Sequence, residues 1–439
     1  MDVRTRPAAR GGVRTGERAL APDLARGAML LMIVLSNTAF FLYAAEHGPS
    51  GWHPVDGSAA DRAVQFAMIT GLDLRVFPLF AFLFGYGMMQ VMQRQTAAGG
   101  TERGAVRVLR RRSLWLLAFG LLHGALLLGG DILGAYGVAS LVVGALFLRR
   151  RDTTLLVWAG IAVALLVFGE VGSALDVLDA GNAAARAVNP STLYYASGEE
   201  SYPASVATRF STWLFVAFGG GLLGFSFHAA MLLGFWCARR RVLEEPGRHL
   251  PLLRTTAVVG LAIGWLGGLP AALAHINAVD APPAVLAEAG PLYAAQSITG
   301  LAGGLGYVAV FALVAHAPSA RARRSLPVVA VAAVGRRSLS CYLAHSLIFA
   351  PLLAAWGLGW GAHLTSWSMA LFAVGVWLVT VVGACALDRA HRRGPAEAVL
   401  RRLMYGRPPA SADGEVRATA GVPLTKLAAW ARKHLAPRS

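Results

Sequence analysis

The sequence predicts an all-α, polytopic integral membrane protein: a helical bundle of about ten transmembrane helices with both termini in the cytoplasm. Hydrophobic residues make up 56% of the 439 positions and charged residues only 14%, unlike a soluble domain. The apolar residues form blocks long enough to cross a bilayer. All but four of the 40 basic residues fall in six clusters between alternate blocks, where the positive-inside rule predicts cytoplasmic connections.

Ten blocks are long enough to span when glycines and single polar residues are allowed. In chain order they cover residues 27–45, 66–92, 114–130, 132–148, 154–175, 210–237, 255–274, 297–317, 338–356 and 367–387. The first block is about 18 residues long and lacks a small-x-small cleavage site, which favours a retained span over a cleaved signal. The blocks define a transmembrane domain, 27–387, between a basic N-terminal segment, 1–26, and a cytoplasmic tail, 388–439.

The tail is expected to contain two helical segments. Residues 394–406 favour a short helix that begins at Pro395. Beyond them, apolar residues between Leu424 and Leu435 recur at helical spacing opposite basic ones, which is typical of an amphipathic helix on a membrane surface. The net charge of +17 therefore reflects topology, with the anionic inner leaflet as the partner. Nucleic acid is excluded because no soluble basic domain is present to bind it.

The segment 110–137 is the richest in chemical information. Three arginines open an apolar run that is interrupted by His123 and ends at Gly129, Gly130 and Asp131. Residues 114–148 are expected to form a helical hairpin with an outward-facing tip, with His123 roughly 12 Å beneath Asp131 and out of direct contact. Ionisable groups are costly within a membrane, so both are site candidates. A structural hydrogen bond between helices explains His123 equally well.

Asp73 and Arg75 lie well inside the second block, where charges are usually paired and face a cavity. They are expected to pair with each other or with groups on other helices. Pro78 would break or bend the helix there. The alternative is a re-entrant or interfacial segment, with the true span beginning near Val76.

Two further sets of polar residues lie near the ends of the first span. Asp23 and Arg26 form an i, i+3 pair, for which a structural clamp at the inner surface is a sufficient explanation. His47 and His53 lie in the connection 46–61 that follows this span, and by themselves they are expected to be ordinary solvent-exposed residues. The three cysteines show no CxxC spacing, so neither a disulfide framework nor a metal site is indicated.

Five ordered motifs resemble the YeiB-type bacterial membrane proteins, a family named for a domain of unknown function, number 418. They are ALAPDLARGAMLLMIVLSN (19–37), FPLFAFLFGYG (77–87), RRRSLWLLAFGLLHGALLLGGDILGAYG (110–137), AVGRRSLSCYLAHSLIF (333–349) and GPAEAVLRRLMYG (394–406). The resemblance implies a multi-pass protein of the bacterial plasma membrane. It implies no particular activity.

DLARG, FPLFAFLFG and GRRSLSCYLAHS are also similar to motifs of a broader group of membrane acyltransferases. This group includes the heparan-glucosaminide acetyltransferase type and the bacterial O-acyltransferases that modify surface sugars. The similarity implies acyl-CoA as donor and a catalytic histidine shortly after the first span. His47 and His53, beside Trp52, both occupy that place, and the spacing does not choose between them.

Acyl transfer needs a base to deprotonate the acceptor and donors to hold the oxyanion. His123 is a candidate base, Asp131 or Glu170 are candidates to orient it or to bind the acceptor, and Asn37 is a candidate oxyanion donor. Arginines would hold the phosphates of acyl-CoA. The candidates for the donor site are Asp23, Arg26, Arg110 to Arg112, Arg336 and Arg337, with His345 as a tunnel or cofactor contact.

A transporter is the alternative function. It would use Asp73, Arg75, His123 and Asp131 as a substrate or proton path. Against it stands the absence of a detectable internal repeat, and against the enzyme stands the lack of a tightly spaced catalytic motif. A channel fits less well, because no span carries a stripe of polar residues.

Overall fold

A computed structural model describes residues 19–186, 189–317, 319, 321 and 325–405. Within these ranges the chain is helical, and its one β-bridge joins His47 to Pro54. The all-α prediction is therefore confirmed for the part of the chain described. The expected amphipathic helix at 424–435 and most of the basic segment 1–26 lie outside it.

Seven helical segments are long and apolar enough to cross a membrane. They are α1 with η2 (Leu20–Ser36 and Ala39–Phe41), α3 (Val76–Ala97), α6 (Asp152–Arg186), α8 to α9 (Tyr202–Leu214, Phe215–Gly220 and Gly221–Leu223), η4 with α11 (Pro246–His249 and Leu250–His275), α12 with α13 (Pro283–Leu286 and Pro291–Ala315) and α17 (Ser366–Arg389). The pair α15 (Leu326–Arg336) and α16 (Ser338–Leu353), bent by 87°, supplies an eighth. The described residues thus contain seven or eight candidate spans, whereas the sequence predicted ten.

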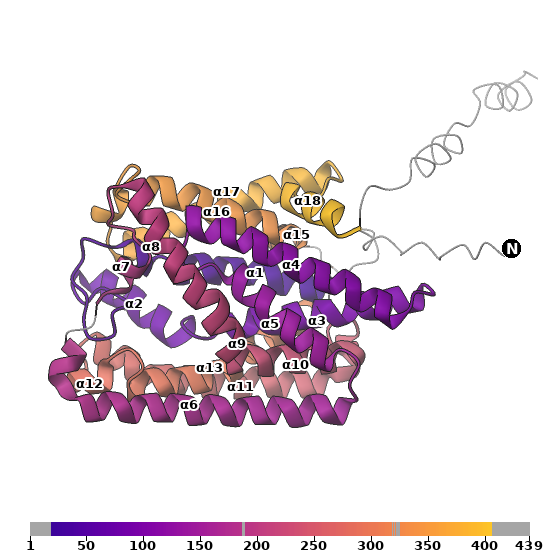
Figure 1. Cartoon of the computed structure of the whole chain (residues 1–439), viewed down its shortest axis with the longest axis horizontal. Coiled ribbons are helices and arrows are strands. Elements are labelled where there is room, and N and C mark those ends of the chain that lie inside the picture. Colours follow the sequence, from indigo (N-terminus) through magenta and orange to yellow (C-terminus); the bar gives the residue numbers. More distant parts are fainter. Residues whose placement is uncertain (1–18, 187–188, 318, 320, 322–324, 406–439) are drawn as a thin grey trace, which may run out of the picture.

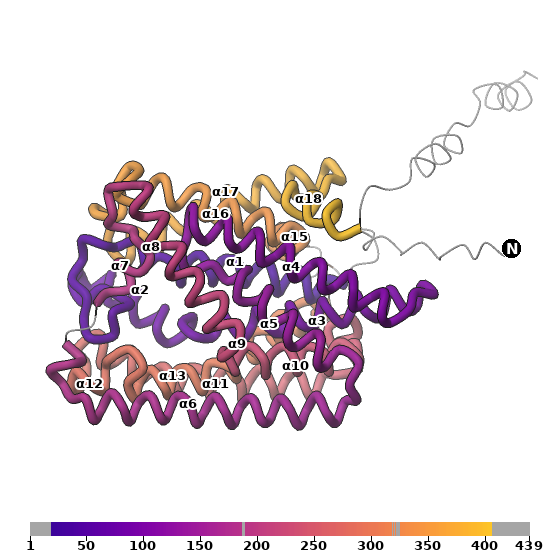
Figure 2. Tube along the Cα trace, viewed as in Figure 1, coloured from indigo at the N-terminus to yellow at the C-terminus, as the bar shows by residue number. Residues whose placement is uncertain are grey.

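The remaining helices are α2 (Ala59–Gly71), α4 (Glu102–Leu126), α5 (Ile132–Phe147), α7 (Ser191–Tyr194), α10 (Phe225–Arg239) and α18 (Pro395–Tyr405). Figure 1 shows α6, α11 and α13 as one layer, with α15 to α18 on the opposite side and α3, α5 and α10 between them. The tube in Figure 2 shows that α18 lies at one end of the bundle, and α7 and α12 lie at the other. We name these the basic end and the opposite end.

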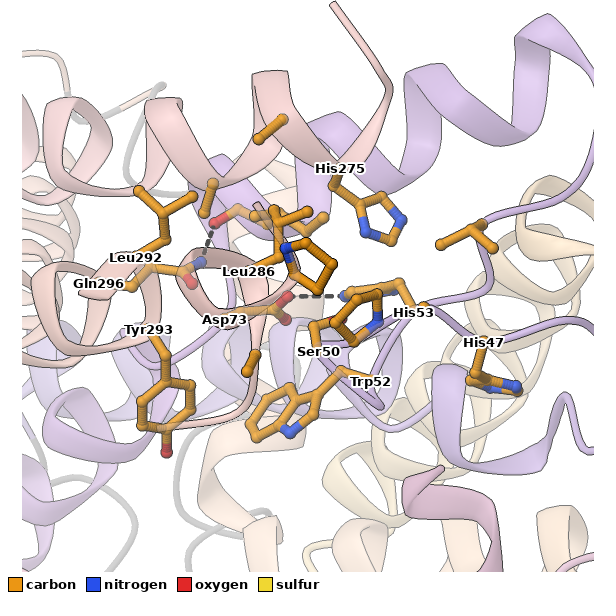
Figure 3. A pocket seen from close by; sticks show the side chains of 18 of the residues that line it. His47, Ser50, Trp52, His53, Asp73, His275, Leu286, Leu292, Tyr293 and Gln296 are labelled. Atoms are coloured by element: carbon orange, nitrogen blue, oxygen red, sulfur yellow. Dashed lines mark hydrogen bonds and ion pairs between the residues drawn. The ribbon is translucent and has the colours of Figure 1, made fainter. Parts of the chain in front are cut away.

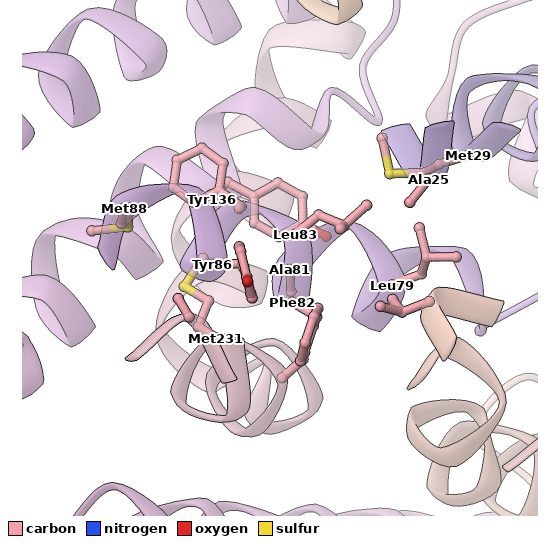
Figure 4. Close-up of a cluster of buried hydrophobic side chains, with 14 of the residues drawn as sticks. Ala25, Met29, Leu79, Ala81, Phe82, Leu83, Tyr86, Met88, Tyr136 and Met231 are labelled. Carbon is pink, nitrogen blue, oxygen red and sulfur yellow. The ribbon is translucent and has the colours of Figure 1, made fainter. Parts of the chain in front are cut away.

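The core is built around α3. Phe82, Leu83 and Tyr86 of this helix are buried against Met29 of α1 and Met231 of α10, as Figure 4 shows. By contrast, α6 exposes large apolar side chains such as Phe168, which is 79% exposed. Such a surface is expected for a helix that faces lipid.

The second predicted span begins later than residue 66. Its helix is broken at 72–75, between α2 and α3, and Leu74 has a φ of 61°. Pro78 lacks an N–H and therefore fits the first turn of α3, not the interior of a longer helix. The alternative start near Val76 is confirmed, and the 66–92 span is wrong.

The sixth predicted span, 210–237, is also interrupted. A π-helical turn spans Phe215–Gly220, α9 ends at Leu223, and Gly224 separates it from α10, which begins at Phe225. A β-carbon at position 224 would lie 2.2 Å from the carbonyl oxygen of Gly220, so the turn requires a glycine there. The chain changes direction here, and α10 packs onto α3 and α6.

The hairpin of α4 and α5 forms as expected, but its tip is covered. Arg209 of α8 donates hydrogen bonds to the carbonyl oxygens of Ala125 (3.1 Å) and Leu126 (3.3 Å). Gly129 at the tip is buried. These contacts satisfy carbonyl groups at the end of α4 that have no partner within the helix.

The predicted C-terminal helix is present as α18, which begins at Pro395. Glu397 accepts hydrogen bonds from the backbone N–H groups of Leu339 (2.8 Å) and Ser340 (3.1 Å) at the start of α16. Arg111 of α4 donates to the carbonyl of Leu403 at 2.7 Å. These contacts hold α18 against the basic end of the bundle.

Candidate functional site

A cavity of about 510 Å³ lies at the opposite end of the bundle. Its walls come from the loop after α1, the turn between α2 and α3, the end of α11 and the start of α13. We call it the outer cavity. Figure 3 shows His53 and Asp73 pointing toward each other inside it, with Trp52 and Tyr293 below and His275 above.

His53 and Asp73 form a hydrogen-bonded pair. Nε2 of His53 lies 2.7 Å from Oδ2 of Asp73, and both residues are buried. Ser36 at the end of α1 donates to the other carboxylate oxygen at 3.4 Å. An imidazole that gives Nε2–H to a carboxylate keeps the lone pair of Nδ1, so it is oriented to accept a proton there.

The expectation that His47 and His53 are solvent-exposed is wrong for His53, which is only 4% exposed. The loop folds back on itself, because the N–H of Val55 donates to the carbonyl of Glu46 (2.9 Å) and His47 bridges to Pro54. This hairpin directs His53 inward. His47 is half-buried, with Nδ1 2.9 Å from the carbonyl of Ala45, and burial lowers its pKa, so it is neutral at pH 7.

His275 completes this site and was missed by the sequence analysis. Its Nε2 lies 3.0 Å from the carbonyl of Pro54, and its ring centroid lies 6.0 Å from that of His53. The sequence does contain a signal for it: His275 follows the 255–274 span, whose preceding connection is basic and therefore predicted to be cytoplasmic. His275 is thus predicted to lie on the same side of the membrane as His53. Tyr293 and Gln296 of α13 also line the cavity.

Arg75 does not pair with a carboxylate in any described contact, contrary to one expectation. Its guanidinium donates to the backbone carbonyls of Ile69 (3.2 Å), Asp73 and Gly264. The side chain is fully buried. A β-carbon at Gly268 would lie 2.2 Å from Nη2 of Arg75, so α11 needs a glycine there to admit it. Arg75 therefore joins the helix break to α11.

A second pair lies in the α4–α5 hairpin. Nδ1 of His123 is 2.8 Å from Oδ1 of Asp131, and both side chains are buried. The expected separation of roughly 12 Å is wrong. In a hairpin, the distance between residues on its two helices depends on how far each lies from the tip. Asp131 caps the start of the returning helix, α5, where it accepts a hydrogen bond from the N–H of Gly134 at 2.8 Å.

Tyr342 of α16 joins this pair, and the sequence analysis missed it. Its hydroxyl is 3.2 Å from Oδ1 of Asp131, and its ring centroid is 5.0 Å from that of His123. Glu170, the alternative candidate to orient His123 or bind the acceptor, accepts a hydrogen bond from Ser297 at 2.6 Å, between α6 and α13. Of the two candidates, Asp131 is therefore the one that orients His123.

A second cavity, of about 540 Å³, opens at the basic end. We call it the basic cavity. It brings together the predicted Arg26, Arg112 and Arg336. The sequence analysis did not assign four other arginines that line it, Arg94, Arg392, Arg393 and Arg401. Asp23 is buried beside Arg26 (3.4 Å), as the i, i+3 spacing predicts.

The lining of the basic cavity combines charged and apolar side chains. Asp388 accepts from Arg336 (2.8 Å) and Arg337 (3.1 Å), which neutralises part of the charge. The apolar and aromatic part of the lining consists of Met29, Phe80, Phe84, Leu116, Leu133 and Tyr342. This combination suits a ligand with anionic groups at one end and an apolar or uncharged chain at the other.

A small void of about 10 Å³ lies beside the end of α1, lined by Asn37, Tyr342 and His345 among others. His345 is buried, and its Nε2 is 3.2 Å from the hydroxyl of Thr380. Arg26 and Met29 of α1 line the basic cavity, and Ile33 and Asn37 line the void. This spacing places all four on one face of the helix.

The fold and these cavities define a multi-pass helical membrane protein with ionisable sites at both ends. A family model described as "Protein of unknown function (DUF418)" matches residues 237–407. The chain is 27% identical over 411 residues to "Uncharacterized protein YxaH" of Bacillus subtilis, with 89% of this chain and 95% of that protein covered. To "Uncharacterized protein YeiB" of Escherichia coli it is 26% identical over 395 residues, covering 88% and 96%. The chain is therefore similar to DUF418 proteins over residues 237–407 and to YxaH and YeiB over most of its length, which confirms the predicted resemblance to YeiB-type proteins.

Proposed function

We propose that this protein is a membrane acyltransferase, which passes an acyl group from a donor such as acyl-CoA to an acceptor on the other side of the membrane. The observation that carries the proposal is the pair of cavities at opposite ends of one bundle. One contains a buried His–Asp pair, and the other is lined by arginines. The two cavities thus supply the two binding sites that such a reaction needs.

The basic cavity is the proposed donor site. Arginine binds phosphate through paired, charge-assisted hydrogen bonds, and Arg26, Arg112 and Arg336 all line this cavity. The uncharged arm and acyl group of the donor would lie against the apolar part of the lining. Acyl-CoA has this distribution of charge.

The outer cavity is the proposed acceptor site, with His53 as the general base. Asp73 fixes its tautomer and would stabilise the imidazolium that forms when an acceptor hydroxyl or amine loses its proton. Geometry thereby favours His53 over His47, whose Nδ1 faces a backbone carbonyl. Asn37 remains the proposed oxyanion donor.

The face of α1 that carries Arg26, Met29, Ile33 and Asn37 is the proposed path between the two sites. Ser36, next to Asn37, donates to Asp73 and so reaches the outer pair. A void of about 10 Å³ has room for one water molecule at most. Passage of an acyl group therefore requires side chains around Tyr342 and His345 to move.

The proposed topology has both termini in the cytoplasm of a bacterial plasma membrane. When the bent pair of α15 and α16 is counted as one span, the described residues hold eight spans, an even number. An α4–α5 hairpin that enters and returns would keep the number even, as in the predicted ten. The arginines of the basic cavity would then face the cytoplasm and anionic lipid.

Acyl transfer is tested in proteoliposomes with acetyl-CoA supplied at the basic end and ethanolamine or glycerol as probe acceptors on the other side. The expected result is saturable release of thiol on the donor side and acylated probe on the acceptor side. A folded sample that neither binds nor turns over acetyl-CoA or palmitoyl-CoA would overturn the proposal.

The donor site gives a separate prediction. Arg112 lies over the ring of Phe84 at 4.5 Å and lines the basic cavity. Replacing it with methionine is expected to weaken CoA binding about tenfold, since a charge-assisted hydrogen bond contributes about 1.5–3 kcal/mol. Arg107→Met, on the exposed side of the same helix, is the control, and calorimetry is the measurement. Equal effects of the two changes would contradict a specific donor site.

Export of a small molecule is the second candidate. It is favoured by the helix breaks at 72–75 and between α15 and α16, because broken helices that line cavities are common at transport sites. Uptake of an anionic probe into proteoliposomes without thioester turnover would favour it over acyl transfer.

A further inference from the structure

The cluster of His123, Asp131 and Tyr342 lies between the two ends of the proposed path. Leu116 of α4 lines the basic cavity, and Leu128, two residues after the end of α4, lines the small void. His123 lies between them in the chain. Tyr342 lines both spaces. The cluster therefore reaches the basic cavity through Tyr342, which contacts both Asp131 and His123.

Hydrogen bonds fix the orientation of the His123 ring. One carboxylate oxygen of Asp131 accepts hydrogen bonds from Nδ1–H of His123 (2.8 Å) and from the hydroxyl of Tyr342 (3.2 Å). The other oxygen accepts one from the N–H of Gly134 (2.8 Å). The carboxylate is fully buried. With these three donors it cannot rotate without losing a buried hydrogen bond, and it holds the imidazole in one tautomer.

The other ring nitrogen of His123, Nε2, is buried and makes no hydrogen bond within the described part of the chain. Leaving a buried polar atom unpaired costs about 1–3 kcal/mol. Nδ1 of His345 is also buried and unpaired, but the other nitrogen of His345 bonds to the hydroxyl of Thr380, whereas that of His123 bonds to a carboxylate that can stabilise an imidazolium. A group that arrives with a ligand is the simplest partner for Nε2 of His123.

We propose that His123 is the general acid that protonates the leaving thiolate of the donor, with Asp131 and Tyr342 as positioning residues. This inference rests on the acyltransferase function proposed above. In this role His123 acts as an acid, not as the base that the sequence predicted, and Tyr342 helps to position it. An imidazolium beside a buried carboxylate is stabilised by it and can donate from its other nitrogen.

The reaction balances with these two histidines. The carbon–sulfur bond of the thioester breaks as a carbon–oxygen or carbon–nitrogen bond to the acceptor forms. The acceptor proton goes to His53, and the Nε2 proton of His123 goes to sulfur, which leaves a neutral thiol. His53 then releases a proton at its end of the protein, and His123 takes one up at the other. No further reactant is needed.

The test compares two donors that carry the same acyl group. One is acetyl-CoA, whose alkyl thiolate benefits from protonation. The other is acetyl-thionitrobenzoate, whose thiolate has a low pKa and leaves without a proton. His123→Gln is expected to slow transfer from acetyl-CoA by about 100-fold or more but transfer from the aryl thioester by less than about tenfold. Tyr342→Phe, which keeps the ring, should show the same donor dependence with a smaller loss.

His345→Gln is the matched control, because His345 is a buried histidine of the same region that bonds to Thr380. It should affect both donors equally. Equal losses for both donors in His123→Gln, with Tyr342→Phe also indifferent to the donor, would overturn the general-acid role while leaving the acyltransferase intact. Failure of the folded wild type with both donors would instead overturn the proposed function, and this inference with it.

Discussion

Replacing His53 with glutamine is expected to reduce acyl transfer by about 10²- to 10⁴-fold, because that is the usual contribution of a positioned general base. Glutamine fills a similar volume and can donate to Asp73, but it cannot accept a proton from the acceptor. The rate is measured as acylated ethanolamine formed from acetyl-CoA. Binding of CoA at the other end should not change.

His47→Gln is the control for this prediction. His47 lines the same cavity, but its Nδ1 faces the carbonyl of Ala45 and it has no carboxylate partner among the described contacts. A loss of less than about tenfold is expected. If His47→Gln abolished the reaction and His53→Gln did not, the assignment of the base to the His53–Asp73 pair would be wrong.

Replacing Arg75 with methionine is expected to destabilise the protein by about 3 kcal/mol or more. Three carbonyl groups, those of Ile69, Asp73 and Gly264, would lose a charged donor, and they lie where water cannot replace it. The break between α2 and α3 would also lose its connection to α11. Thermal unfolding of the purified protein in detergent should show a clear decrease in the midpoint.

Arg62→Met provides the comparison. Arg62 lies on the exposed face of α2 and donates to the carbonyl of Gly57 at 3.2 Å. Its removal is expected to change stability by less than about 0.5 kcal/mol, as for most surface substitutions. Similar unfolding midpoints for the Arg75 and Arg62 variants would show that the Arg75 network is not a stabilising element.

The sequence predicted the helical class and most spans because hydropathy over about 20 residues is a local property. It also placed Arg26, Arg112 and Arg336 on one side, since all three end or begin spans there, but it did not assign the other four arginines named above to the basic cavity. The break near Val76 was predictable as an alternative from Pro78, whose covalent structure restricts where it fits in a helix. The 66–92 and 210–237 spans were wrong because a break inside an apolar run leaves little trace in hydropathy.

The pairing of side chains within the sites was decided by tertiary structure. The sequence identified His53, Asp73, His123 and Asp131 as candidate site residues, but it did not predict which of them are in contact. The pair His53–Asp73 depends on a loop that folds inward, and the bond from Tyr342 to Asp131 joins residues 211 positions apart. Such contacts depend on how helices rotate and cross. Side-chain packing between helices sets these angles, and residues distant in the chain contribute most of that packing.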